Sequence, residues 1–154
     1  MIYTPMTRKA MKIAYDAHAG QVDKTGLPYI YHPAHLAETM TDENSVIAAL
    51  LHDVIEDTDI TIEDLAREGF DDEVLTALTL LNHNPADDYM DYVSRLSTCP
   101  LARRVKLADL RHNSDISRLD SVDEKAARRL EKYARAIRLL EAVEHPESLS
   151  SGSH

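Results

Sequence analysis

Four ionisable side chains follow directly on the most apolar part of the sequence. Residues 46–51 (VIAALL) are all apolar, and His52-Asp53 and Glu56-Asp57 lie within the next six positions. If the helix continues, His52 shares a face with Glu56 and Asp53 shares a face with Asp57, because residues four apart are neighbours. Burying these groups unpaired is unfavourable, so a metal ion that neutralises them explains their position. The simpler alternative is that the two later acids only solvate the helix end.

Two further segments offer ligands for such an ion. His32 lies in the string YIYHP, where Pro33 restricts the backbone that presents the imidazole. Asp109 lies in the apolar helical pattern VKLADLRHN, with Lys106 three residues before it and Asn113 four residues after it on the same face. Two imidazoles and two carboxylates would supply four ligands and leave positions for water. This ligand chemistry is compatible with Mn²⁺, Fe²⁺, Co²⁺, Ni²⁺ or Zn²⁺.

Helical periodicity predicts the elements that must position these residues. The segment 43–56 is apolar around most of its circumference, which predicts a central helix buried on several sides. Residues 20–31 contain two glycines and a proline, which predict a loop. We therefore predict one all-α domain over residues 2–144, a bundle of about eight helices with the metal site at the end of the central helix, and a disordered tail over 145–154. The other helices are expected at 5–18, 33–40, 61–69, 71–82, 87–97, 101–113 and 123–143.

Composition and charge exclude several classes of function. Hydrophobic residues make up 44% and charged residues 29% of the chain, as in ordinary globular proteins. Seventeen Lys and Arg against 27 Asp and Glu give a net charge of −10, which disfavours a nucleic-acid partner. The apolar runs are far shorter than the ~20 residues of a membrane span, and residues 1–20 lack a signal-peptide core. We expect a cytoplasmic protein with no membrane partner, and the single Cys99 excludes an intrachain disulfide.

The order and spacing of these motifs resemble a known family. His32, His52-Asp53 and Asp109 match the H…HD…D pattern of HD-domain metal-dependent phosphohydrolases. The longer strings GQVDKTGLPYIYHP, AALLHDVIEDT and VKLADLRHN resemble the hydrolase domain of the RelA/SpoT family and its small stand-alone alarmone hydrolases, over about residues 10–140. The resemblance implies an all-α enzyme of the stringent response that removes the 3′-pyrophosphate of guanosine alarmones, (p)ppGpp.

The resemblance also implies roles for individual residues. The four residues of the H…HD…D pattern would hold one divalent ion, which is Mn²⁺ in the family. Glu56 and Asp57 match the acidic pair that orients or deprotonates the attacking water. Lys24 matches a lysine that faces substrate phosphates, and Asn113 matches a ligand-binding asparagine.

Three positions depart from the family pattern and alter the expected substrate pocket. Asp23 stands before Lys24 where the family usually has an arginine that helps to hold the guanine base. The basic residue of the family's ADRLHN-like string is shifted to Arg111, about 100° around the helix, and Ile116 replaces a ligand-facing threonine. Lys106 and Arg111 are candidates for the positive charge that a nucleotide requires. Two alternatives therefore stay open: a phosphomonoesterase acting on another nucleotide or on NADPH, and a non-catalytic nucleotide-sensing domain.

Overall fold

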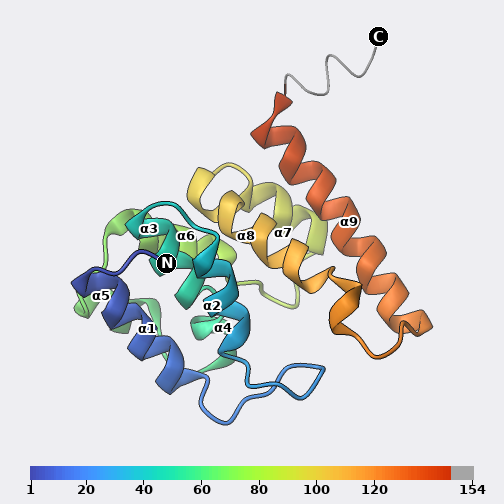
Figure 1. Cartoon of the computed structure of the whole chain (residues 1–154). Helices are drawn as coiled ribbons and strands as arrows, with labels where there is room; N and C mark the ends of the chain where they lie inside the picture. The colour runs from blue at the N-terminus through green and yellow to red at the C-terminus, as the bar shows by residue number, and fades with distance from the viewer. Residues whose placement is uncertain (147–154) are drawn as a thin grey trace.

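The chain folds as an all-helical bundle, as predicted (Figure 1). The computed structural model describes residues 1–146, so most of the predicted tail, 147–154, lies outside the described residues. Within residues 1–146 the only β-type pairing is a single bridge between Val22 and Pro28. The elements in chain order are α1 (Pro5–Ala17), α2 (Tyr31–Glu38), α3 (Glu43–Leu51), α4 (Val54–Asp57), α5 (Ile62–Arg67), α6 (Asp72–Leu81), α7 (Tyr89–Leu96), α8 (Pro100–Asn113), the 3₁₀ helix η1 (Ile116–Arg118) and α9 (Glu124–Glu144).

Local side-chain caps explain where several helices begin. Thr4 accepts a hydrogen bond from the Thr7 backbone, and Pro5 occupies the first helical position of α1. Thr61 and Asp64 form the predicted capping box at the start of α5. Because such signals are local, every expected helix except the central one agrees with the structure to within two residues at each end.

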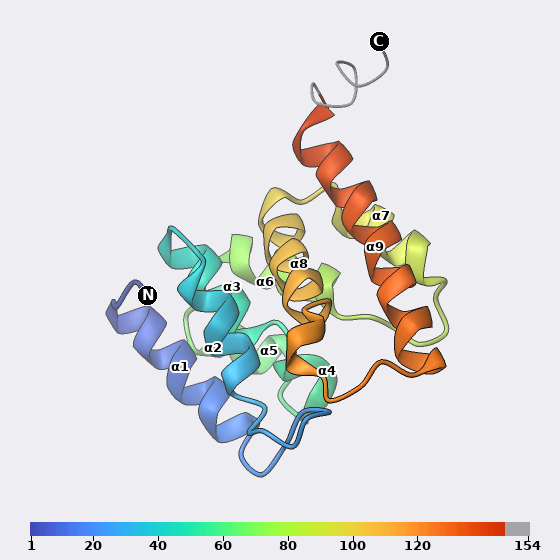
Figure 2. The same ribbon diagram turned by 45° about the vertical axis from the view of Figure 1, so that its right-hand side comes forward.

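The predicted central helix is confirmed in its position. α3 packs against α1, α2, α6 and α8, and Figure 2 shows it enclosed between α1 and α8. Every residue from Ser45 to Leu51 is buried. Its many-sided apolar surface is therefore used in full by neighbouring helices.

The central helix is shorter than predicted, however, because it ends at Leu51 instead of continuing through residue 56. The backbone turns at His52 and Asp53, where Asp53 has φ −105° and ψ −1°, and a single helical turn, α4, follows. Side chains on consecutive positions of a continuous helix point about 100° apart. The turn instead brings both side chains into one space, with His52 Nε2 2.9 Å from Asp53 Oδ2. The prediction of one helix over 43–56 was wrong at this step.

A second layer of helices completes the bundle. α9 packs against α7 and α8, and η1 lies in the connection between α8 and α9 (Figure 2). The predicted loop over residues 20–31 lies between α1 and α2. Even α9, with 21 residues, is too polar to cross a bilayer, and no other helix within residues 1–146 is long and apolar enough to do so.

Candidate metal centre and substrate pocket

The structure brings together the four side chains that the sequence indicates as metal ligands. His32 comes from α2, His52 and Asp53 from the turn between α3 and α4, and Asp109 from α8. One ligand atom of each lies within 4.8 Å of all the others. His32 Nε2 is 2.8 Å from Asp109 Oδ1, and His52 Nε2 is 3.5 Å from the same oxygen. Adjacent ligands at ~2.1 Å from one ion are about 3 Å apart, so this spacing fits a single divalent cation.

The orientation of His52 provides an independent test of that fit. Its Nδ1 donates to the Ala49 carbonyl at 2.6 Å, so in the neutral imidazole Nε2 carries the lone pair that can bind a cation. Nε2 is buried and makes no hydrogen bond within the described part of the chain, although it faces two carboxylates. Burial lowers the pKa of His52, but the Asp53 and Asp109 carboxylates outweigh burial and raise it well above its ordinary value. The position therefore attracts positive charge, as a cation site must.

His112 orients His32, which sequence reasoning did not foresee. The two Nδ1 atoms are 2.7 Å apart. Burial, followed by the nearby Arg118 guanidinium, lowers the pKa of His112 to about 4, so His112 is neutral at pH 7 and can accept a hydrogen bond. The Nδ1–H of His32 then donates to His112, which directs Nε2 of His32 toward the cluster. The available signal was spacing, since His112 lies three residues after Asp109 on α8.

Neighbouring polar groups also hold the two carboxylates. The Tyr29 hydroxyl donates to Asp53 Oδ2. Lys106 Nζ lies 3.0 Å from Asp109 Oδ2, and Asn113 Nδ2 donates to Asp109 Oδ1 at 3.0 Å. Burial raises the pKa of Asp109, but Lys106 and the two adjacent histidines outweigh it and keep this pKa well below the ordinary value. Such contacts fix the orientation of metal ligands.

Lys106 occupies a different position from the one expected of a substrate-binding residue. Its side chain is 15% exposed, and its ammonium group pairs with Asp109 above the rings of Tyr89 and Tyr92, at 5.9 and 5.4 Å from their centres. Burial lowers the pKa of Lys106, but Asp109 outweighs burial and raises it well above the ordinary value. Lys106 therefore stabilises the Asp109 carboxylate, although it also lines the cavity that contains the cluster.

The cavity that contains the cluster has a volume of about 160 Å³, and Glu56 lines it whereas Asp57 does not. Glu56 lines it together with His52, Asp53 and Asp109, and Glu56 Oε1 accepts a hydrogen bond from the His83 backbone at 2.9 Å. Asp57 is not among the lining residues. Burial, then Asp53 and Glu56, raise the pKa of Asp57 to about 6. A carboxylate with a pKa close to neutrality is suited to accept a proton.

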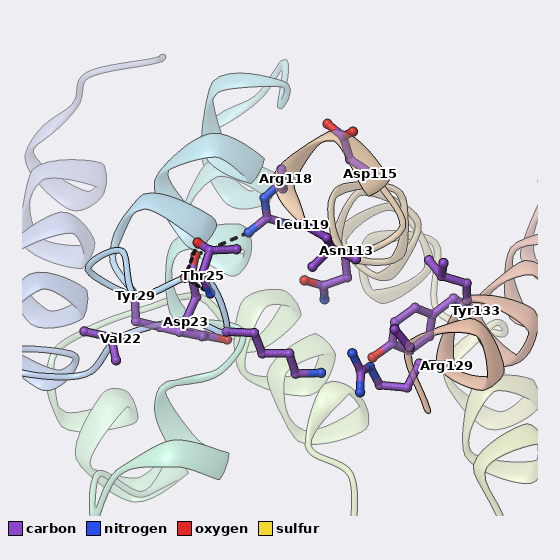
Figure 3. A pocket seen from close by; sticks show the side chains of 13 residues that line it. Val22, Asp23, Thr25, Tyr29, Asn113, Asp115, Arg118, Leu119, Arg129 and Tyr133 are labelled. Atoms are coloured by element: carbon purple, nitrogen blue, oxygen red, sulfur yellow. Dashed lines mark hydrogen bonds and ion pairs between the residues drawn. The ribbon is translucent and has the colours of Figure 1, made fainter. Parts of the chain in front are cut away.

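A larger cavity of about 420 Å³ adjoins the first and shares Asn113 and Tyr133 with it. Figure 3 shows Asn113 between the loop on one side and Arg129 and Tyr133 of α9 on the other. Lys24 lines the same cavity, and its pKa is lowered by burial and then by the cations of α9, Arg129 first among them. The cavity therefore carries positive charge in a protein whose net charge is −10. Sequence reasoning identified Lys24 and Asn113 but not Arg129.

Arg111 does not reach either cavity. It lies two residues after Asp109 and therefore about 200° around α8. Its guanidinium donates to Glu141 Oε1 at 2.9 Å on an exposed face. Ile116, the third departure from the family pattern, is 58% exposed and lines neither cavity. The expected contribution of Arg111 to substrate binding therefore has no geometric support.

Comparison with known proteins identifies the family. The sequence profile of the HD domain matches residues 10–82, which include His32, His52 and Asp53. This chain contains an HD domain. It is related to the hydrolase domain of SpoT and RelA proteins.

Similarity to individual relatives covers more of this chain than the HD-domain profile does. A protein of Synechocystis sp. named probable guanosine-3′,5′-bis(diphosphate) 3′-pyrophosphohydrolase is 33% identical over 143 residues, which cover 84% of this chain and 19% of that protein. The bifunctional (p)ppGpp synthase/hydrolase SpoT of Escherichia coli is 50% identical over 62 residues, 38% of this chain and 9% of SpoT. The chain thus spans less than a fifth of these curated relatives.

A solved structure shows that the fold itself is shared. The structure of a metazoan SpoT orthologue, described as hydrolysing ppGpp, superposes with a TM-score of 0.72 at 22% sequence identity. The superposition covers 89% of this chain and 85% of that one. At this level of identity, the similarity extends to the fold and leaves the pocket residues to be compared individually.

Proposed function

We propose that this protein is a metal-dependent phosphohydrolase that removes pyrophosphate from the 3′ position of guanosine 3′,5′-bis(diphosphate) and its triphosphate analogue. The observation that carries the proposal is the buried cluster of His32, His52, Asp53 and Asp109, whose ligand atoms converge within 4.8 Å. The names of the relatives support the choice of substrate, since several of them are 3′-pyrophosphohydrolases.

The four clustered residues would hold one divalent ion, and Mn²⁺ is the metal we propose. When bound, such an ion supplies positive charge that stabilises a phosphoryl oxygen and acidifies the attacking water. Asp57, with its raised pKa of about 6, then accepts the proton from that water. Glu56, held by the His83 backbone, faces the same cavity and orients the water.

The adjoining cavity would hold the remainder of the nucleotide. Lys24 and Arg129 line it from opposite elements and can pair with phosphate oxygens. Asn113 lies at the junction of the two cavities, where its amide can reach both Asp109 and a bound ligand. In the reaction, water attacks the phosphorus attached to the 3′ oxygen, that P–O bond breaks, and pyrophosphate and a 3′-hydroxyl are released.

The test is product analysis by anion-exchange chromatography after incubating the Mn²⁺-loaded protein with guanosine 3′,5′-bis(diphosphate), other nucleoside phosphates and NADPH. Pyrophosphate together with GDP supports the proposal. Orthophosphate released from another member of the panel, with the bis(diphosphate) untouched, makes the protein a phosphomonoesterase. Nucleotide binding without any turnover makes it a sensor. Asp53→Ala serves as the negative control, because it removes one ligand from the cluster.

A further inference from the structure

The carboxylate of Asp23 is fixed in direction by its own loop. Oδ1 accepts three hydrogen bonds, from the Thr25 backbone at 2.8 Å, the Thr25 hydroxyl at 2.6 Å and the Leu27 backbone at 3.1 Å. Gly26, with φ +85°, allows the chain to turn tightly at this point. Within residues 1–146, the other oxygen, Oδ2, has a single partner, an Arg118 nitrogen at 3.5 Å. Oδ2 therefore keeps free acceptor capacity, because an ionised carboxylate can accept about four hydrogen bonds in total.

Arg118 is tethered beside this carboxylate. One of its terminal nitrogens donates to the His112 carbonyl at 2.7 Å, and the other faces Asp23. The side chains of Arg118 and Asp23 are 26% and 13% exposed, so both are held against the protein. Figure 3 shows the pair on one side of the large cavity, opposite Arg129 and Tyr133. A guanidinium has five N–H donors, so several remain for a ligand.

The cavity is placed and shaped to receive a nucleoside. It meets the metal-side cavity at Asn113 and Tyr133, so a substrate with its phosphate at the metal cluster must extend into it. Its volume of about 420 Å³ is in the ordinary range for small-ligand sites. Apolar side chains complete its wall and can contact a base or ribose: Val22, Leu119, Ala126 and Leu130.

We propose that Asp23 and Arg118 together recognise the edge of the base and select a 6-oxopurine such as guanine over adenine. Guanine presents a ring N–H donor next to its carbonyl oxygen, which matches an acceptor at Asp23 Oδ2 next to donors on Arg118. Adenine presents an unprotonated ring nitrogen and an amino group at the same positions. Its ring nitrogen, an acceptor, would face the Asp23 carboxylate, and its amino group, a donor, would face the Arg118 guanidinium, so neither contact could form a hydrogen bond. The pKa of Asp23 supports an ionised carboxylate, since burial raises it but the bonds from Thr25 and Leu27 outweigh burial.

This inference rests on the proposed function, because it assumes that the phosphate end of a nucleotide lies at the metal cluster. Its test compares kcat/KM for guanosine, inosine and adenosine 3′,5′-bis(diphosphates). Inosine keeps the ring N–H and the carbonyl, so it should be used almost as well as guanosine. Adenosine should be worse by about 10- to 100-fold, the usual value of one two-point base contact.

Asp23→Asn is the decisive variant, because asparagine retains an oxygen for the Thr25 and Leu27 bonds but loses the charge. The guanosine preference should fall to within about threefold through a higher KM for guanosine, with kcat little changed. Asp115→Asn is the matched control. Asp115 lines the same cavity and also accepts bonds from the backbone and hydroxyl of the residue two positions on, Ser117, so Asp115→Asn removes one charge from the cavity and leaves the Asp23–Arg118 pair in place.

Equal kcat/KM for the three substrates, or an unchanged preference in Asp23→Asn, would overturn the inference and leave the proposed function intact. The same loss of preference in Asp115→Asn would overturn it too, since the effect would then come from charge alone. Failure to hydrolyse any of the three would refute the proposed function instead. Calorimetric binding of guanosine and adenosine 3′,5′-bisphosphates to the wild type and Asp23→Asn then decides the inference: a guanosine preference lost in Asp23→Asn supports it, and equal affinities refute it.

Discussion

Replacing Lys106 by methionine tests whether Asp109 is a metal ligand held by a buried ion pair. Lys106 Nζ lies 3.0 Å from Asp109 Oδ2, and the two side chains are 15% and 8% exposed. Methionine keeps most of the packing against Tyr89 and Tyr92 but removes the charge. Deleting one partner of a buried pair costs about 3–5 kcal/mol, because the other charge is left uncompensated. We take about 3 kcal/mol for the protein in chelator, since His32 and His52 also face Asp109.

A bound divalent ion should compensate most of that loss. With saturating Mn²⁺ the ion neutralises Asp109, and we expect the destabilisation to fall to about 1 kcal/mol. By linkage, Lys106→Met should then bind Mn²⁺ about 30-fold more tightly than the wild type, because 1.4 kcal/mol corresponds to a factor of ten. In thermal unfolding, the melting temperature should fall by about 6–12 °C in chelator and by about 2–4 °C with Mn²⁺.

The control is Lys132→Met. Lys132 lies 4.4 Å from the centre of the Tyr89 ring but makes no ion pair with Asp109. It should cost less than about 1 kcal/mol, with or without Mn²⁺. An equal loss for Lys106→Met in chelator and in Mn²⁺ would refute the reasoning, since Asp109 would then not contact the ion. No loss in either condition would show that the ion pair contributes nothing to stability.

Three further predictions concern the centre itself. Asp53→Ala should abolish Mn²⁺ binding in calorimetry and lower turnover at least about 1000-fold. Its circular dichroism spectrum should show unchanged helix content, and retained Mn²⁺ affinity would exclude Asp53 as a ligand. His112→Phe should weaken Mn²⁺ binding about 10- to 100-fold, because His32 loses the acceptor that fixes its tautomer. If the variant binds Mn²⁺ as tightly as the wild type, the 2.7 Å contact between the two histidines has no such role. Asp57→Asn should remove the acidic limb of the pH–rate profile, since the pKa of Asp57 is about 6. The pKa of Asp57 is near 3.8 in the unfolded chain and about 6 in the folded protein. Protonated Asp57 therefore stabilises the folded state fully below pH 3.8, and this stabilisation is lost as the pH rises through about 6. Urea unfolding at pH 7.5 should therefore show Asp57→Asn more stable by about 1 kcal/mol, a figure reduced for solvent screening, and the gain should disappear at pH 4.

The helices could be predicted because their signals are local, and the four clustered residues because they match the H…HD…D pattern in order and spacing. A Thr cap, a proline at the first position or an apolar period of 3.6 residues acts within one or two turns of the chain. The turn at His52 and Asp53 could not be predicted in this way. The apolar period continues through Val54 and Ile55, yet the helix ends at Leu51 and the turn that follows places both side chains in the cluster.

The residues that sequence reasoning missed act across long separations in the chain. Tyr29 contacts Asp53 across 24 positions, and His112 contacts His32 across 80. Neither pair has a spacing that a helix or a turn would impose, so only the packing of α2 against α3 and α8 brings them together. The orientation of Arg111, in contrast, could have been predicted from the sequence. Its position two residues after Asp109 already places it on the far face of α8, because each residue adds about 100°.

The charges around the centre explain how an acidic protein can hold a polyanion. The two carboxylates would balance a bound divalent ion, and the Lys106 ammonium lies 3.0 Å from one of them. A nucleotide diphosphate adds negative charge that this centre alone cannot balance, so cations must come from elsewhere. Lys24 from the loop and Arg129 from α9 line the large cavity, and burial, followed by repulsion from the cations of α9, lowers the pKa of Lys24. A phosphate bound between these cations would offset their repulsion, so the large cavity can supply the positive charge that the metal centre lacks.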